Sequence, residues 1–160
     1  ILESILEKSG LKKGEEYFAQ EYITDENGNR VRNEQHNYMQ PDVVVAYPGG
    51  RKIIIDSKVS LSAYVKYVET DTDELKIVAE KEHLISVKQH IDELSRKSYQ
   101  DYVESLDFVM MFIPNEPAYI LAMQLDSNLW DYAYRKRILL ISPTNLVASL
   151  KVVADLWKRE

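Results

Sequence analysis

The sequence predicts an α/β protein with a mixed central β-sheet flanked by helices. Two β-branched runs, 43–45 and 53–55, lie on either side of the turn residues Pro48-Gly49-Gly50, which is typical of a β-hairpin. Two continuous apolar runs, 108–113 and 138–141, come later, and each follows a helical pattern. Because antiparallel strands come first and helix-to-strand units follow, we expect a mixed sheet with helices on its faces.

Hydrophobic periodicity and turn residues predict the other elements. Apolar residues at helical spacing predict a short helix over 1–8, which Gly10 ends, and a long helix over 71–94. Alternating residues predict a strand over 16–24, followed by a turn at 25–29. Further helices are expected at 117–125 and 146–157, while 32–40 is read as a loop or irregular strand, and 60–67 and 130–137 as helix or loop.

Composition limits the class of protein. The chain has 160 residues, of which 45% are hydrophobic and 29% charged, as in soluble globular domains, so we expect one domain over 1–160. The absence of cysteine excludes disulfides and thiolate metal sites. A net charge of -6 argues against nucleic-acid binding driven by the electrostatic field of the whole protein. An acidic chain can still contain a locally basic groove that binds DNA. No apolar stretch approaches the roughly 18 residues of a membrane span, so we expect this fragment to make no membrane contact.

Two aspartates are predicted to face each other at the open end of the hairpin. If 48–50 forms the loop, Tyr47 faces Arg51, and the same register places Asp42 opposite Asp56. Directly opposed Cβ atoms lie roughly 4.5–5.5 Å apart, where like charges repel. A divalent cation between the carboxylates explains the pair, because hard cations bind carboxylate oxygens. Turn and capping roles for the two acids are the simpler alternative.

The residues after the second aspartate extend this hypothesis. Asp56 and Lys58 point to one face of a strand, and the backbone carbonyl of Ser57 adds an oxygen ligand. With Asp42, these groups suit Mg²⁺ or Mn²⁺, which polarises a phosphate and lowers the pKa of a bound water. Lys58 would orient that water or assist its deprotonation. The predicted reaction is phosphodiester hydrolysis.

The long helix carries further candidates. His83 and His90 are two helical turns apart and share a face, so they either contact the phosphate or metal or are hydrogen-bonded core histidines. Lys97 is another candidate phosphate contact, with a solvated surface lysine as the alternative. Three tyrosines, Tyr64, Tyr67 and Tyr99, are candidates for stacking on bases, or else core residues.

These residues lead to a family resemblance. Pro41-Asp42 with Asp56-Ser57-Lys58 resembles the motif of the PD-(D/E)xK nuclease superfamily. Longer stretches resemble the bacterial RmuC family of DNA recombination proteins: 2–11, 41–45, 55–61, 83–99, 112–114 and 142–144.

The resemblance implies a restriction-endonuclease-like fold and a nuclease role in DNA recombination that limits rearrangement at inverted repeats. It implies that Asp42 and Asp56 bind the metal, that Lys58 is the catalytic lysine, and that DNA is the partner. Family members carry an N-terminal membrane anchor and a coiled coil. We therefore expect a domain excised from a longer bacterial chain that is cytoplasmic, anchored at the inner membrane and able to self-associate through its coiled coil.

One departure from the family pattern keeps alternatives open. The family has a glutamate just upstream of the first leucine, and Glu3 and Glu7 are out of register with it. The first alternative is therefore a non-catalytic DNA-binding module that keeps the nuclease fold. The second is an interaction domain whose partner surface is the last helix, with its stripe of Leu146, Leu150, Val153 and Trp157.

Overall fold

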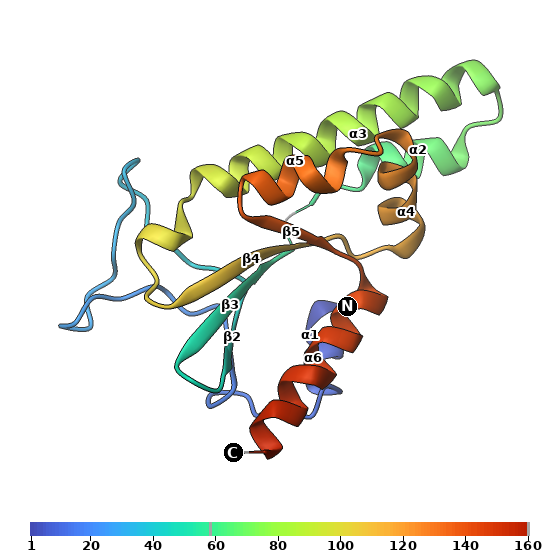
Figure 1. The fold of residues 1–160 in the computed structure, drawn as a ribbon. Coiled ribbons are helices and arrows are strands. Elements are labelled where there is room, and N and C mark those ends of the chain that lie inside the picture. Colours follow the sequence, from blue (N-terminus) through green and yellow to red (C-terminus); the bar gives the residue numbers. More distant parts are fainter. Residues whose placement is uncertain (58, 160) are drawn as a thin grey trace.

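The computed structural model describes residues 1–57 and 59–159, and within them a five-stranded mixed sheet lies between two layers of helices (Figure 1). The strand order follows the sequence, β1-β2-β3-β4-β5. Neighbouring strands are antiparallel from β1 to β3 and parallel from β3 to β5, which confirms the predicted mixed sheet. The strands are Tyr17–Ala19 (β1), Val43–Tyr47 (β2), Arg51–Asp56 (β3), Leu106–Phe112 (β4) and Ile138–Ile141 (β5).

The helices fall close to the predicted segments, and both undecided segments, 60–67 and 130–137, are largely helical. Thr72 begins the longest helix, because its side-chain oxygen accepts a hydrogen bond from the amide of Leu75. Asn115 and Ser142 cap two later helices in the same way. The helices are Leu2–Glu7 (α1), Ser62–Glu69 (α2), Asp73–Arg96 (α3), Glu116–Leu125 (α4), Leu129–Arg135 (α5) and Pro143–Lys158 (α6), with a 3₁₀ turn at Tyr99–Asp101 (η1).

The hairpin between β2 and β3 has the predicted register. Tyr47 pairs with Arg51, and the ladder continues to Val43 opposite Ile55. Gly49 and Gly50 occupy the turn with φ angles of +91° and +74°, which side chains other than glycine rarely adopt. The turn residues therefore determine which side chains face each other along the hairpin.

Parallel pairing brings three strand ends to one edge of the sheet. Asp56, the last residue of β3, pairs with Met111 of β4, and Phe112 of β4 pairs with Ile141 of β5. The carboxyl ends of β3, β4 and β5 therefore meet at this edge, where ligands bind in many open α/β sheets.

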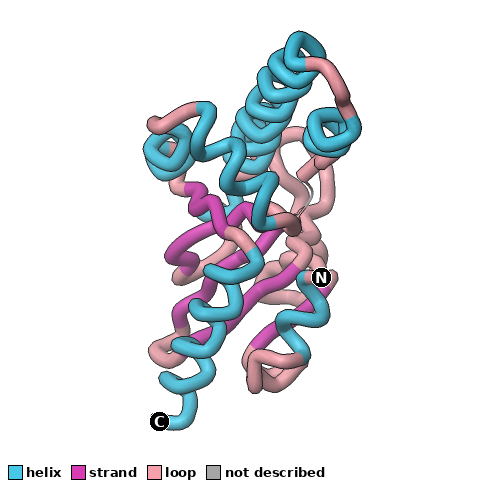
Figure 2. Tube along the Cα trace, turned by 90° about the vertical axis from the view of Figure 1, so that its right-hand side faces the viewer, coloured by secondary structure: helices cyan, strands magenta, loops and turns pink. Residues whose placement is uncertain are grey.

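Two hydrophobic clusters cover opposite faces of the sheet. On one face, Ile54 and Met111 pack with Val87 and Ile91 of α3. On the other, Ile55 and Phe112 pack with residues of α1 and α6. Figure 2 shows α1 and α6 lying apart from the layer that contains α3. Leu146, Leu150 and Val153 of α6 are buried in this second cluster, so most of the stripe considered as a partner surface is core.

The strand predicted over 16–24 is wrong beyond Ala19. Gln20 adopts a left-handed conformation with φ of +57°, which ends β1. Residues 20–40 then leave the sheet as an arm with isolated bridges between Thr24 and Arg30 and between Arg32 and Tyr38. Local periodicity does not reveal the turn at Gln20, because a left-handed residue leaves no mark in the alternation of apolar and polar residues.

No helix in the described ranges is long and apolar enough to cross a bilayer.

Candidate active site

Two buried carboxylates lie at the edge where the parallel strands end. Asp56 closes β3 and is 2% exposed, while Asp42 immediately precedes β2 and is 9% exposed. The hairpin ladder stops at Val43 and Ile55, one residue inside the two acids. Burying two ionisable acids at adjacent positions costs free energy unless partners compensate for it, so this edge is the primary candidate for a functional site.

Asp42 is held by groups from both neighbouring segments. Its Oδ2 accepts hydrogen bonds from the Ser57 amide at 2.8 Å and the Ser57 hydroxyl at 3.1 Å. Its Oδ1 accepts a hydrogen bond from Nε2 of Gln20 at 3.3 Å. Ser57 thus orients one acid while directly following the other. Coordination by its carbonyl stays a prediction.

Gln20 is a site residue that sequence reasoning missed. Its amide reaches Asp42 because β1 ends at Ala19 and the backbone turns at Gln20. The expected strand over 16–24 placed this side chain in a regular ladder instead. No sequence signal identifies the contact, since glutamine is unusual in the left-handed region.

Lys97 brings a positive charge to the second acid. Its Nζ lies 3.3 Å from Oδ2 of Asp56 and its side chain is 34% exposed. Lys97 directly follows α3, so the packing of that helix on the sheet sets where the amine lies relative to the end of β3. Lys58, the predicted catalytic lysine, lies outside the described residues.

The negative charges of both carboxylates act on the phenol of Tyr99. Burial, and then the negative charges of Asp56 and Asp42, raise the pKa of Tyr99 well above its ordinary range. The phenol therefore stays protonated next to the acids. Because Tyr99 is 2% exposed, it is not available to stack on a base as considered from the sequence.

The two histidines of α3 have different environments. His83 is fully buried, and its Nε2 lies 2.8 Å from the carbonyl of Ala118 in α4, away from the acids. His90 lines the small hollow beside Asp56, and its Nε2 accepts a hydrogen bond from the Ser60 amide at 3.0 Å. His90 therefore anchors the segment that follows Asp56, whereas His83 joins α3 to α4.

The sequence of the whole chain matches one known protein family. The profile of the RmuC family matches residues 1–160. The chain belongs to the RmuC family.

Curated RmuC relatives match the whole chain. A DNA recombination protein RmuC homolog of Neisseria meningitidis is 45% identical over 167 residues, covering 100% of this chain and 27% of that protein. The homolog of Pseudomonas aeruginosa is 40% identical, and the chain covers 34% of it. DNA recombination protein RmuC of Escherichia coli is 41% identical, with 32% covered. The chain thus spans about a third or less of these relatives' length, and no solved structure matches it.

Glu3 lines the same hollow as Asp42 in this RmuC-family chain. It lines a hollow of about 350 Å³ together with Asp42, Ser57 and Gln20. Asp56 instead lines a smaller hollow of about 90 Å³ with His90 and other residues of α3. The first helix therefore supplies an acid to the hollow beside Asp42.

The oxygen atoms of the acidic side chains decide which metal ion the site suits. Across 1–57 and 59–159, no group of three or more histidine, aspartate or glutamate side chains is arranged to hold an ion. Mg²⁺ keeps several waters and binds through one or two carboxylates plus substrate phosphates. The two oxygen donors, Asp42 and Asp56, fit that chemistry, and the oxygen ligands favour Mg²⁺ or Mn²⁺ over softer metals.

Proposed function

We propose that this RmuC-family domain hydrolyses DNA phosphodiester bonds with Mg²⁺ or Mn²⁺ during DNA recombination. The observation that carries the proposal is the pair of buried aspartates at the carboxyl ends of the parallel strands, with Lys97 on one of them. The relatives are named DNA recombination proteins, which supports DNA as the substrate. A restriction-endonuclease-like fold is part of the proposal, supported by a mixed sheet with an acid at a strand end.

Each residue has a distinct role in this proposal. Asp42 and Asp56 hold the cation with the Ser57 carbonyl, and the bound cation supplies Lewis acidity and a more acidic water. Ser57 and Gln20 fix the Asp42 carboxylate by hydrogen bonds, so its orientation is set before substrate arrives. Lys58 orients the attacking water.

Lys97 and Tyr99 limit the negative charge around the acids. Lys97 lies beside Asp56 and offsets negative charge on the reacting phosphate. Tyr99 keeps its proton because the carboxylates and burial raise its pKa. Its hydroxyl is therefore a hydrogen-bond donor rather than another negative charge near the phosphate.

Substitution of Asp56 tests the proposal. Labelled single-stranded and branched DNA is incubated with the purified chain and Mn²⁺, and cleavage is followed on denaturing gels. We expect Asp56→Asn to lower the cleavage rate about a hundredfold or more, because it removes a ligand charge at the reacting centre. Asp126→Asn is the matched control, since Asp126 also pairs with a lysine, Lys88, at 3.0 Å. Cleavage that survives Asp56→Asn at the wild-type rate rejects the assignment.

A second candidate function is DNA binding without turnover. The net charge of -6 and the lack of a three-acid group within the described ranges favour it. Salt-dependent DNA binding in a chain that never cleaves DNA with Mn²⁺ or Mg²⁺ is the result that selects this function. Binding of Mn²⁺ is measured by calorimetry in the same samples, since a non-catalytic module needs no cation at Asp42 and Asp56.

A further inference from the structure

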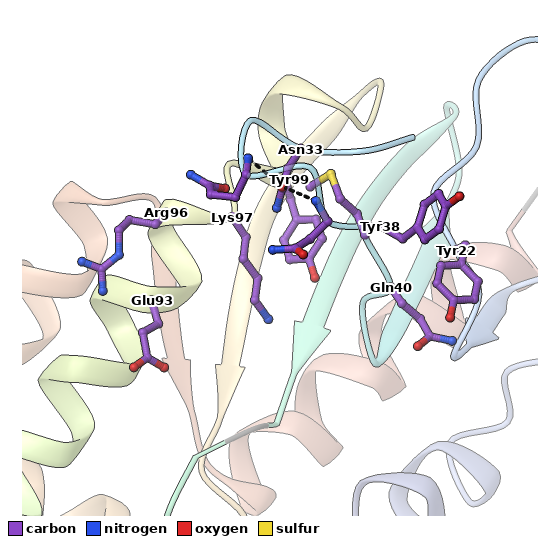
Figure 3. Close-up of a pocket in the computed structure, with 11 residues that line it drawn as sticks. Tyr22, Asn33, Tyr38, Gln40, Glu93, Arg96, Lys97 and Tyr99 are labelled. Atoms are coloured by element: carbon purple, nitrogen blue, oxygen red, sulfur yellow. Dashed lines mark hydrogen bonds between the residues drawn. The ribbon is translucent and has the colours of Figure 1, made fainter. Parts of the chain in front are cut away.

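A pocket of about 560 Å³ lies between the 20–40 arm and the end of α3 (Figure 3). Residues of the arm, including Tyr22, Tyr38 and Gln40, form one side. Lys97, at the end of α3, stands on the opposite side. Pockets of roughly 300–1,000 Å³ bind small-molecule ligands, so the volume suits one nucleotide.

The arm side of the pocket is built from planar groups. The rings of Tyr22 and Tyr38 meet edge to face with centroids 6.0 Å apart. The guanidinium carbon of Arg30 lies 3.8 Å from the Tyr22 ring centroid, and that of Arg32 lies 4.2 Å from the Tyr38 ring centroid. Arg30 and Arg32 support the rings but do not line the pocket, so Tyr22 and Tyr38 supply its stacking surfaces. Aromatic rings are surfaces on which proteins stack unpaired bases.

Hydrogen bonds fix these planes in the absence of a ligand. Arg32 donates to the carbonyl of His36 and to the hydroxyl of Tyr38, each at 3.0 Å. Asn33 Oδ1 accepts hydrogen bonds from the amides of Gln35 and Asn37, each also at 3.0 Å. A pre-ordered platform loses less conformational entropy when it binds, which favours a ligand of matching flat shape.

The rest of the pocket is polar. Side-chain amides of Asn33 and Gln40 line it. The Asn33 oxygen is used within the arm, and Gln40 Nε2 donates to the Gln20 carbonyl at 2.7 Å. The Asn33 NH2 group can therefore serve as donor, and the Gln40 oxygen as acceptor, for a base edge. Arg96 and Lys97 add positive charge, and Glu93 adds one negative charge on the same side. The pocket therefore combines stacking surfaces, hydrogen-bonding groups and a net positive wall.

Lys97 connects this pocket to the acid pair. It lines the pocket and also the small hollow that contains Asp56, with its Nζ 3.3 Å from that carboxylate. A phosphate close to Lys97 therefore lies within reach of both places. The nucleotide attached to that phosphate would have its base on the arm side.

We propose that this pocket receives an unpaired base of the DNA strand whose backbone reaches Asp56. Duplex DNA keeps its bases stacked inside the helix, so only a single-stranded or locally unpaired nucleotide presents a base to the pocket. The inference rests on the proposed function in one respect, that the strand at Asp56 is DNA. It adds that the preferred DNA is unpaired at this point.

Anisotropy of a fluorescent oligothymidine and of a fluorescent blunt duplex, both titrated in EDTA, tests the proposal. Tyr38→Ala is expected to weaken oligothymidine binding by roughly 5- to 150-fold, the range for loss of one base stack, with little change for the duplex. Tyr38→Phe keeps the ring and is expected to retain most of the affinity. Tyr134→Ala is the matched control, because Tyr134 is 47% exposed, Tyr38 is 45% exposed, and Tyr134 stacks on Trp130 in α5.

The outcomes separate this inference from the proposed function. Unchanged oligothymidine affinity in Tyr38→Ala overturns the pocket assignment, whether or not wild-type protein cleaves DNA with Mn²⁺. Equal losses for oligothymidine and duplex also overturn it, because they indicate a general electrostatic surface. If Tyr38→Ala loses affinity for oligothymidine only, and the wild-type protein never cleaves DNA, the pocket is supported and the nuclease function is rejected. Thermal melting monitored by circular dichroism shows that each variant is folded.

Discussion

The amine of Lys97 lies 3.3 Å from the carboxylate of Asp56, although the two residues are 41 positions apart in the chain. The contact joins the end of the longest helix to the end of the central strand. It also places a positive charge beside an acid that is 2% exposed. This pair links the candidate metal site to the pocket on the other side of Lys97.

Removing the amine is expected to have opposite effects on metal binding and on cleavage. Lys97→Met removes a cation that repels a divalent ion next to Asp56, so Mn²⁺ affinity should rise several-fold. Cleavage should fall by about tenfold or more, because charge on the phosphate is no longer offset. Calorimetry with Mn²⁺ and gel assays with DNA measure the two effects.

Lys136→Met serves as the control for this substitution. Lys136 pairs with Asp92 at 3.5 Å, and its side chain is 37% exposed compared with 34% for Lys97. The two lysines are alike in exposure, but their acids differ. Asp92 is 34% exposed, so losing its pair with Lys136 costs about 0–1 kcal/mol. Asp56 is buried and loses a partner for its charge, so Lys97→Met is expected to cost more stability. Equal Mn²⁺ affinities and equal cleavage rates in the two variants would rule out a role for Lys97 at the site.

The two histidines of α3 are expected to respond differently to substitution. His83→Ala leaves a cavity and removes the contact with the Ala118 carbonyl, so the free energy of unfolding should fall by about 2–4 kcal/mol. His90→Ala removes the acceptor for the Ser60 amide, with a stability loss of about 1 kcal/mol. Urea unfolding measures both values.

Cleavage assays complete the histidine comparison. His90 is a positioning residue, because it holds the segment after Asp56 through Ser60. His90→Ala should therefore lower the rate of DNA cleavage about tenfold while leaving the KM for DNA nearly unchanged. His83→Ala, measured below its unfolding temperature, should cleave at the wild-type rate. The reverse pattern would place His83 at the site instead.

Tyr99 predicts a loss of stability in alkali. Its pKa is raised in the folded protein above the ordinary value of 10.0, so the unfolded chain loses this proton first. The stability that the protonated Tyr99 contributes is fully present below pH 10.0 and is lost as pH rises toward the folded pKa. The free energy of unfolding then falls by at most about 1.4 kcal/mol per pH unit. Tyr99→Phe should give a shallower slope in urea unfolding above about pH 10, and the same slope as wild type below it.

Other tyrosines limit the size of this difference. The pKa values of Tyr119 and Tyr132 are also raised, by burial and by a hydrogen bond to Asp92 respectively. Some alkaline slope should therefore persist in Tyr99→Phe. Tyr132→Phe is the comparison variant, because it removes a raised tyrosine outside the candidate site. An alkaline slope that Tyr99→Phe leaves unchanged contradicts the predicted electrostatic environment.

Turn residues and periodicity predicted the hairpin correctly, but they predicted the strand before it, over 16–24, too long. Register followed from the loop residues because two glycines with positive φ determine where the strands turn. The end of β1 at Ala19 did not follow, because the left-handed Gln20 is held by distant contacts such as that with Asp42. Alternating residues along 16–24 therefore predicted a strand that the fold interrupts.

The sequence by itself determined the mixed sheet, the hairpin register and the positions of Asp42 and Asp56 one residue beyond the last pair of the hairpin, because these depend on periodicity and on a short turn. Only the tertiary structure decided that Lys97 reaches Asp56, that His83 and His90 occupy different surroundings and that the 20–40 arm forms a pocket with α3. Those contacts join segments far apart in the chain. Their geometry comes from how α3 packs on the sheet, which no local pattern encodes.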